Sequence, residues 1–299
     1  MKLFLYKYRE WTDRTKEILS NQTVYYSKPD ELNDPFDCKA ELFSSRLDVG
    51  FAEEIKLHHL TSFYKCYLSE NSSSKMLSEV KKKHMKYELE KCKTTDAKFE
   101  YIKRFFKQTM PPTFKLTEAK DTIDSFNRQV ENMGVLSLSE NFKNILMWSH
   151  YAKDHTGLVL AFNIDRESLT NVLFDKVEYV KEFPKLDLKD TNQKIHYNFS
   201  IDGGSILKKD VELQMNDPNI QNVFFKKADD WLYEKEWRLL RQKYGVYAFP
   251  GKLEKIYFGC RCSNDTKKEV KTIVSEKYDY EVQYINMMIG NSSYTLEEE

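Results

Sequence analysis

The chain has 299 residues, enough to bury a substantial core in one large or two modest domains. Lysine and arginine balance aspartate and glutamate at 47 each, so the net charge indicates no particular class of partner. Aromatic residues make up 14% of the chain while glycine and proline are scarce, which excludes a disordered chain and indicates an ordered globular protein.

Cysteine and hydropathy patterns exclude two further classes of protein. The five cysteines are odd in number and sparse, so they predict no disulfide framework. Cys260 and Cys262 lack the second pair that a zinc site needs, and we predict no bound metal. No apolar run reaches the roughly 18 residues of a membrane span, and the first residues are charged too early for a signal peptide. We therefore expect a cytoplasmic location and no membrane partner.

The first segment, Lys2 to Arg9, alternates in the manner of a strand, with Lys7 and Arg9 on one face and Tyr8 on the other. A short helix capped by Thr12 or Asp13 and a strand over 23–27 are expected next. Turn-forming residues fill 28–37, and an Asx-type turn there is predicted to bury a phenylalanine at position 36.

A long region of helical period follows, from about residue 50 to residue 132. Between Lys75 and Lys120 it carries thirteen basic and six acidic residues, interleaved with aromatic ones. Two interpretations remain open for this surplus: a solvated helix face, or a surface that contacts nucleic acid.

The stretch 135–163 combines two predicted strands with a helix between them. Ser137 and Ser139 alternate with leucines as in a half-buried strand, and a helix from Asn144 to His155 is expected to stop near Gly157. A second strand covers 158–164.

One face of that helix would carry Asn144, Trp148, Tyr151 and His155, whereas His150 points elsewhere. Such a stripe forms either an aromatic seam in a core or a wall for a planar ligand.

The second informative stretch is Trp231 to Leu240. As a strand it places Glu234, Glu236 and Arg238 on one polar face. As a helix it would give only a weak, functionally silent pair between Glu234 and Arg238. The aromatic content favours the strand.

Elsewhere we predict strands over 176–181, 255–259 and 280–289, a loop with some helix up to about 219, a helix over 264–276 and a frayed tail over 297–299.

Several of these blocks, LYKYR, YYSKPDELNDPFD, MWSHYAKDHTG, WLYEKEWR and IYFGCR, together resemble a bacterial domain family of unknown function that is often met beside defence genes. The order of the blocks is similar to that of the ADP-ribosyltransferase superfamily. This resemblance implies one α+β domain over 1–299, with a mixed β core and a basic helical insertion over 50–132.

The resemblance also implies NAD as a substrate and a set of site residues. Glu236 would stabilise the positive charge that develops on the ribose, and Glu234 would orient or deprotonate the acceptor. The NAD-binding set is Lys7, Tyr8 or Arg9 in the first strand, the serine motif at Tyr26-Ser27 or at Ser137-Ser139, and Trp148, His150 and Tyr151 in the central block.

Three hypotheses for function follow. The first is an intracellular ADP-ribosyltransferase, a toxin or antiphage effector with an antitoxin partner, whose region from Lys75 to Lys120 binds a nucleic-acid acceptor. The second is a metal-independent nuclease that uses His150 or His155 with Glu236. The third is a non-enzymatic module that binds nucleic acid or protein.

Overall fold

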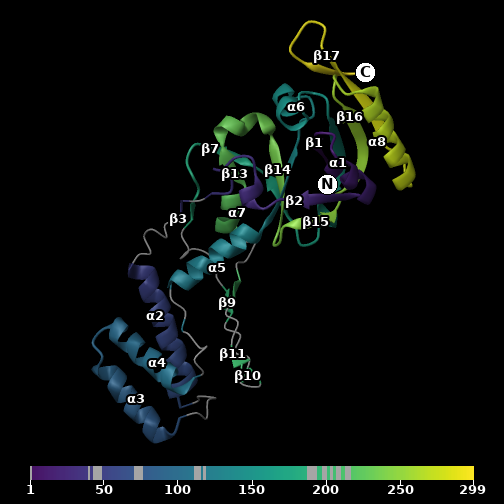
Figure 1. The fold of residues 1–299 in the computed structure, drawn as a ribbon. Helices are drawn as coiled ribbons and strands as arrows, with labels where there is room; N and C mark the ends of the chain where they lie inside the picture. The colour runs from purple at the N-terminus through teal and green to yellow at the C-terminus, as the bar shows by residue number, and fades with distance from the viewer. Residues whose placement is uncertain are drawn as a thin grey trace. The chain divides into compact units, whose positions relative to one another are not determined.

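The structure is a computed structural model, and it describes residues 2–39, 41–42, 49–70, 77–110, 116, 119–186, 194–196, 201–202, 205–206, 210–212 and 217–299. The chain divides into two compact units, each described by itself below. The sheet unit comprises residues 1–41, 129–184 and 220–299, and the helical unit comprises residues 42–128 and 185–219. Helices and a large sheet together confirm the α+β class (Figure 1).

The sheet unit is built from strands with a few helices. Its strands are β1 (Lys2–Arg9), β2 (Thr23–Tyr26), β4 (Gly134–Ser139), β5 (Leu158–Asp165), β6 (Leu173–Lys176), β7 (Glu178–Val180), β13 (Lys226–Ala228), β14 (Glu236–Arg241), β15 (Gly245–Ala248), β16 (Lys252–Phe258), β17 (Gln283–Ile289) and β18 (Leu296–Glu298). Its helical segments are α1 (Asp13–Asn21), α6 (Ile145–Tyr151), α8 (Asn264–Lys277) and the 3-10 turns η1 (Pro29–Glu31), η4 (Arg166–Ser168) and η5 (Asp229–Glu234).

Eight of the described strands form one sheet in the order β18-β17-β16-β5-β1-β4-β14-β6. β1 and β5 are central and pair antiparallel along their whole length, with Leu5 opposite Phe162. β5 is an almost continuous apolar run because helices cover both faces of the sheet at this point.

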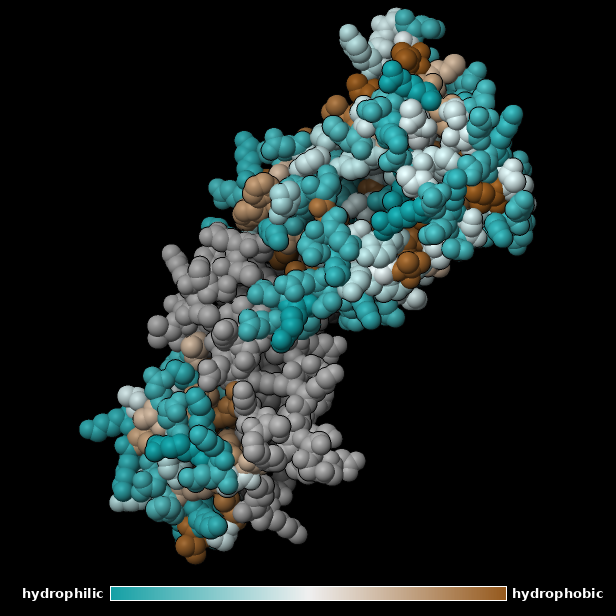
Figure 2. Space-filling model, viewed as in Figure 1, coloured by the Kyte–Doolittle hydropathy of each residue, from teal (hydrophilic) through white to brown (hydrophobic). Residues whose placement is uncertain are grey.

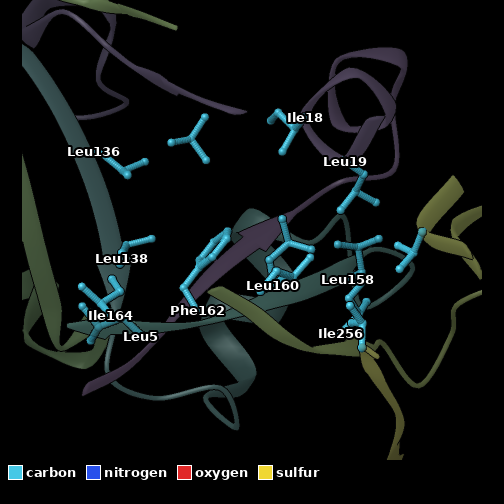
Figure 3. Packing of buried hydrophobic residues seen from close by; sticks show 14 of the residues in the cluster. Leu5, Ile18, Leu19, Leu136, Leu138, Leu158, Leu160, Phe162, Ile164 and Ile256 are labelled. Atoms are coloured by element: carbon cyan, nitrogen blue, oxygen red, sulfur yellow. The ribbon is translucent and has the colours of Figure 1, made fainter. Parts of the chain in front are cut away.

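Opposite faces of the sheet carry separate cores. Leu5, Leu160 and Phe162 point to the face covered by α1 and α8, and pack with Ile18 and Leu19 of α1 (Figure 3). The other face carries Tyr8, Val159 and Ala161 beneath Met147 and Trp148 of α6. The period of two in β1 therefore sorts its side chains onto the two faces as predicted.

The sheet forks beside β4. At its end, Ser139 is paired with Tyr6 of β1, but at its beginning Val135 is paired with Ser27, which directly follows β2. β2 continues instead into a separate ribbon with β15. Between these two points the backbone carbonyl of Ser137 accepts a hydrogen bond from Lys7 Nζ at 2.7 Å. The Lys7 amine thus donates to a carbonyl that, in a continuous sheet, would accept from a backbone N–H of the neighbouring strand.

Helix α6 ends earlier than predicted. Lys153, Asp154 and His155 follow it in the left-handed region, with φ of 46°, 53° and 67°. Each such residue costs roughly 1–2 kcal/mol, so the surrounding packing must hold the turn. A Cβ at Gly157 would lie 2.2 Å from the Arg9 carbonyl oxygen, so only glycine lets the turn approach β1 this closely.

Three other local predictions were also wrong. Phe36 is 66% exposed, although the predicted Asx turn forms when Asp34 accepts a hydrogen bond from its amide. The segment 176–181 holds the end of β6 and the separate strand β7. The C-terminal tail forms β18, which pairs with β17, because the unpaired edge of β17 offers it a full set of partners.

The helical unit contains α2 (Val49–Phe63), a π-helical turn (Tyr64–Leu68), α3 (Glu79–Lys91) and α4 (Thr95–Thr109), with the short strands β8 (Lys185–Leu186), β9 (Lys194–His196), β10 (Ile201–Asp202), β11 (Ser205–Ile206) and β12 (Asp210–Glu212). The chain passes between the two units four times: within β3 (Glu41–Leu42), α5 (Ala119–Asn132) and α7 (Pro218–Phe224), and between Pro184 and Lys185, directly before β8. The hydrophobic core of the helical unit includes the buried side chains of Phe63, Leu89 and Ile102.

Aromatic residues of the basic region mostly serve this core. Phe99 and Phe106 are buried in it, whereas Tyr87 is exposed. Several lysines there pair with acids one helical turn away, as Lys91 does with Glu88. Lys75 and Lys115 lie outside the described residues, as does the side chain of Lys120. On the face of the molecule that Figure 2 shows, polar residues cover most of the described surface and apolar residues form small separate patches. None of the described helices is both long and apolar enough to cross a membrane.

Candidate functional site

A cleft of about 180 Å³ opens in the sheet unit where the sheet forks. It is lined by Tyr6, Lys7, Tyr8, Glu31, Leu32, Asn33, Asp37, Ser137, Leu138, Ser139, Met147, Tyr151, Lys227, Glu234 and Glu236. β1, β4, β14 and the loop after β2 therefore all contribute, although they are far apart in the sequence.

Glu236, the first residue of β14, lies in this cleft and is 3% exposed. Its carboxylate accepts hydrogen bonds from Arg238 Nε at 2.8 Å, Arg238 Nη2 at 3.1 Å and Lys227 Nζ at 3.1 Å. Burial by itself would raise the pKa of Glu236, but the two neighbouring cations outweigh burial and lower it to about 2. Glu236 is therefore ionised at any physiological pH.

Lys227 of β13 joins the acidic residues of the cleft. Its Nζ lies 2.5 Å from Glu234, 3.1 Å from Glu236 and 3.6 Å from Asp37. Burial disfavours the ammonium, yet these carboxylates raise the pKa of Lys227 above its ordinary value. Arg238 is fully buried and also donates to Asp37 at 2.6 Å and to the Phe224 carbonyl at 2.6 Å. Two cations are thus paired with three carboxylates, and this pairing offsets most of the cost of burying these charges.

Glu234 reaches the same cation from a different element. The predicted single strand over 231–240 was wrong, because Glu234 ends η5, and Lys235 then turns the chain in the left-handed region at φ 45°. That turn aims the carboxylates of Glu234 and Glu236 at Lys227. Burial, followed by the nearby charge of Glu236, raises the pKa of Glu234 although Lys227 opposes the shift.

Tyr151 of α6 holds the other oxygen of Glu234. Its hydroxyl donates to Glu234 Oε1 at 2.5 Å and accepts from Asn33 Nδ2 at 3.0 Å. Burial and the adjacent carboxylate raise the pKa of Tyr151, so its proton stays on the phenol. This chain of contacts ties the loop after η1 to the central block of the sequence.

Lys7 enters the cleft from β1. It is half-buried, and its amine donates to the Ser137 carbonyl. Burial, followed by the charge of Arg9, lowers the pKa of Lys7 to about 7, against the pull of Glu236 and Glu234. Two cleft lysines thus have pKa values shifted in opposite directions.

Two other predicted residues, Tyr8 and Ser139, line the cleft, but their hydroxyls form hydrogen bonds with backbone groups. Ser139 Oγ donates to the Glu234 carbonyl at 2.6 Å and accepts from the Asn141 amide at 3.0 Å. Tyr8 Oη donates to the Asn141 carbonyl at 2.7 Å. Both side chains therefore position the strand ends around the carboxylates.

Ser137 also lines the cleft, but the remaining predicted residues do not. Trp148 is fully buried and donates to the Phe142 carbonyl, so this part of the aromatic stripe belongs to the core. Tyr26 is buried in the opposite core and Ser27 pairs through its backbone. Arg9 is half-buried, and its Nε has no hydrogen-bond partner in the described part of the chain.

Neither histidine of the nuclease hypothesis lines the cleft with Glu236. His150 is exposed, and its ring centroid lies 6.4 Å from that of Tyr233. His155 stacks on Trp148 with centroids 6.1 Å apart and contacts Ser149. Among the described residues no group of three or more His, Cys, Asp or Glu side chains is arranged to hold a metal ion.

Sequence reasoning missed Lys227, Asp37 and Asn33. Asp37 and Asn33 stand in one of the blocks quoted for the resemblance, but we interpreted that segment only as a turn. Lys227 is the second of two lysines after a phenylalanine pair, and nothing in the sequence distinguishes it from an ordinary lysine. Only its burial beside three carboxylates identifies it.

The fold and the cleft define an α+β protein with a buried ionic site on a forked sheet. Residues 147–239 match the model of a family described as a protein of unknown function, DUF2971. The matched segment contains Tyr151, Lys227, Glu234, Glu236 and Arg238. No curated protein and no solved structure matches the chain.

Proposed function

We propose that the cleft cleaves the bond between nicotinamide and ribose in NAD and transfers ADP-ribose to an acceptor. The observation that carries this proposal is the pair Glu234 and Glu236, hydrogen bonded to the same ammonium at the cleft and shifted in opposite pKa directions. Paired carboxylates with divergent pKa values are the arrangement that glycosyl transfer uses.

Each carboxylate has a distinct role in this proposal. Glu236 remains ionised and faces the positive charge that develops at the ribose carbon as nicotinamide leaves. Glu234, with its raised pKa, accepts the proton of the attacking acceptor group. Tyr151 orients Glu234 through their hydrogen bond.

The volume of the cleft limits which part of NAD can bind in it. At about 180 Å³ it is smaller than the ~300–1,000 Å³ of common ligand pockets, so it fits one ring with its attached sugar. We place the nicotinamide riboside end there, because that end holds the bond to be broken. Tyr151 and Lys7 line the cleft and would contact this end.

For the acceptor we propose nucleic acid, bound by exposed basic residues of α3 and α4, which include Lys81, Lys83, Arg104 and Lys107. Phosphate contacts of this kind give affinity without sequence preference. A protein that modifies cellular nucleic acid in this way would act as a toxin or antiphage effector and would need an antidote protein.

Label transfer tests the function. The full chain is incubated with NAD labelled in the adenylate phosphate and with total RNA, DNA or protein. We expect label in one acceptor fraction and free nicotinamide in equal amount. Glu236→Gln should lower the rate by ~10²–10³-fold, the typical cost of losing one electrostatic stabiliser. Glu276→Gln, at an exposed site on α8, is the matched control. Intact NAD in every fraction would refute the proposal.

One observation favours a different role. Because Glu236 and Arg238 are completely paired, the cluster suits a structural role in a non-enzymatic binding module. In that case Glu236→Gln unfolds the sheet unit, and the wild-type chain itself leaves NAD intact. Loss of nucleic-acid strands without NAD would instead favour a nuclease.

A further inference from the structure

The cleft contains two lysines in different settings. Lys227 lies within ion-pair distance of three carboxylates, Asp37, Glu234 and Glu236. For Lys7 the described structure shows no ion pair, and its hydrogen bond goes to the neutral carbonyl of Ser137. Glu234 and Glu236, the carboxylates that act electrostatically on Lys7, are thus already paired with Lys227.

The fork explains why Lys7 is there. β1 and β4 separate after the pair Tyr6 and Ser139, and the Lys7 side chain fills the gap. A neutral amine that donates one N–H to a carbonyl keeps its lone pair on another side of the nitrogen. Because Lys7 lines the cleft, the lone pair can meet a bound molecule.

We propose that Lys7 is a nucleophile that forms a Schiff base with a small polyhydroxy aldehyde, such as a sugar in its open-chain form. The nitrogen lone pair attacks the carbonyl carbon, and the C=O π pair moves to oxygen. Two protons shift from nitrogen to that oxygen, which leaves as water, and the C=N double bond remains. No oxidant, reductant or co-reactant is consumed in this condensation.

Neighbouring groups supply what the condensation needs. Glu234, held by Tyr151, is the proton donor and acceptor for the departing oxygen, and its raised pKa suits both tasks. The pKa of Lys7, about 7, leaves a large share of the amine neutral near neutral pH. Hydroxyl and carboxylate groups in the lining suit a substrate rich in hydroxyls, and the volume suits a short one.

Reductive trapping tests this proposal without NAD, so its outcome is separate from that of the label-transfer experiment. The full chain is incubated at pH 7 with D-ribose and sodium cyanoborohydride, and peptide mass spectrometry locates the reduced adducts. We expect Lys7 to be modified at least about tenfold faster than exposed lysines such as Lys252 and Lys268, since an ordinary lysine of pKa about 10.4 is almost fully protonated.

Two variants make the result decisive. Lys7→Arg keeps a donor for the Ser137 carbonyl but cannot form an imine, so the rapid adduct must vanish while the protein stays folded. Glu234→Gln should slow trapping by ~10²-fold or more while Lys7 remains intact. Modification of Lys7 no faster than that of exposed lysines overturns the proposal, as does a rapid adduct that persists in Lys7→Arg.

Discussion

Arg238 Nη2 lies 2.6 Å from Asp37 Oδ2, and this contact joins β14 to a turn 201 residues earlier in the chain. Both side chains are buried. Arg238→Met leaves Asp37 and Glu236 without their guanidinium partner, so we expect a loss of about 3–5 kcal/mol in the free energy of unfolding. Urea unfolding measures it. Arg261→Met, at an exposed site, should change that free energy by less than ~0.5 kcal/mol. Equal effects of the two variants would contradict a buried ionic cluster.

Stability should depend on pH through Glu236. Its pKa falls from 4.5 in the free side chain to about 2 in the folded protein. A lowered carboxyl pKa stabilises the fold above pH 4.5, and this contribution is lost as pH falls toward 2. It amounts to about 3 kcal/mol. The raised pKa of Glu234 acts in the opposite direction, so the comparison is between wild type and Glu236→Gln. Their difference in unfolding free energy should shrink from pH 7 to pH 3, and a constant difference would refute the assignment.

Tyr151→Phe should alter both stability and the pH profile of NAD cleavage. The variant removes the hydroxyl that donates to Glu234 Oε1, and leaving that buried oxygen without a donor costs about 1–3 kcal/mol, although Lys227 still donates to Oε2. The same hydrogen bond lowers the pKa of Glu234, so its loss raises that pKa further. We expect the acid limb of the rate profile to move to higher pH. Tyr294→Phe, at a 95% exposed site, is the control, and an unmoved limb would exclude Glu234 as the base.

Gly157→Ala should destabilise the sheet unit. The new Cβ would lie 2.2 Å from the Arg9 carbonyl and 2.9 Å from that of Ala152, and neither backbone atom can rotate away. Overpacking of this kind costs about 1–3 kcal/mol. Hydrogen exchange should show lost protection at the end of β1. Glu276→Ala on α8 serves as the control, and unchanged protection in Gly157→Ala would mean that the turn adapts without strain.

Binding of RNA should depend on α3. Lys81 and Lys83 are exposed, so replacing both with glutamine removes up to two phosphate contacts. The slope of log K against log salt should then fall by about 0.7 per contact for a single strand. Filter binding at several salt concentrations measures it. The matched variant is Lys268→Gln on α8, and an identical slope in all three proteins would exclude α3 as the binding surface.

The local pattern of the chain was enough to predict many elements. Alternation predicted β1 and its two faces, and Thr12, one of the two residues predicted to cap the first helix, accepts a hydrogen bond from the Thr15 amide at the start of α1. Such features depend on neighbours within a few residues, so a single sequence contains them. Prediction failed where distant segments meet, as in the left-handed turn after α6 and at Lys235, because tertiary packing there outweighs local preference.

What the sequence by itself determined, then, is the α+β class, the period of the central strands and the identity of two acidic residues near position 235. Tertiary structure alone decided that Lys227, Arg238 and Asp37 surround those carboxylates. It also decided that the pairing of β1 with β4 ends beside Lys7. The cleft, and the pKa shifts of the side chains that line it, arise because remote segments bury these side chains together. Burial of that kind depends on the whole packed sheet, which no local spacing of residues specifies.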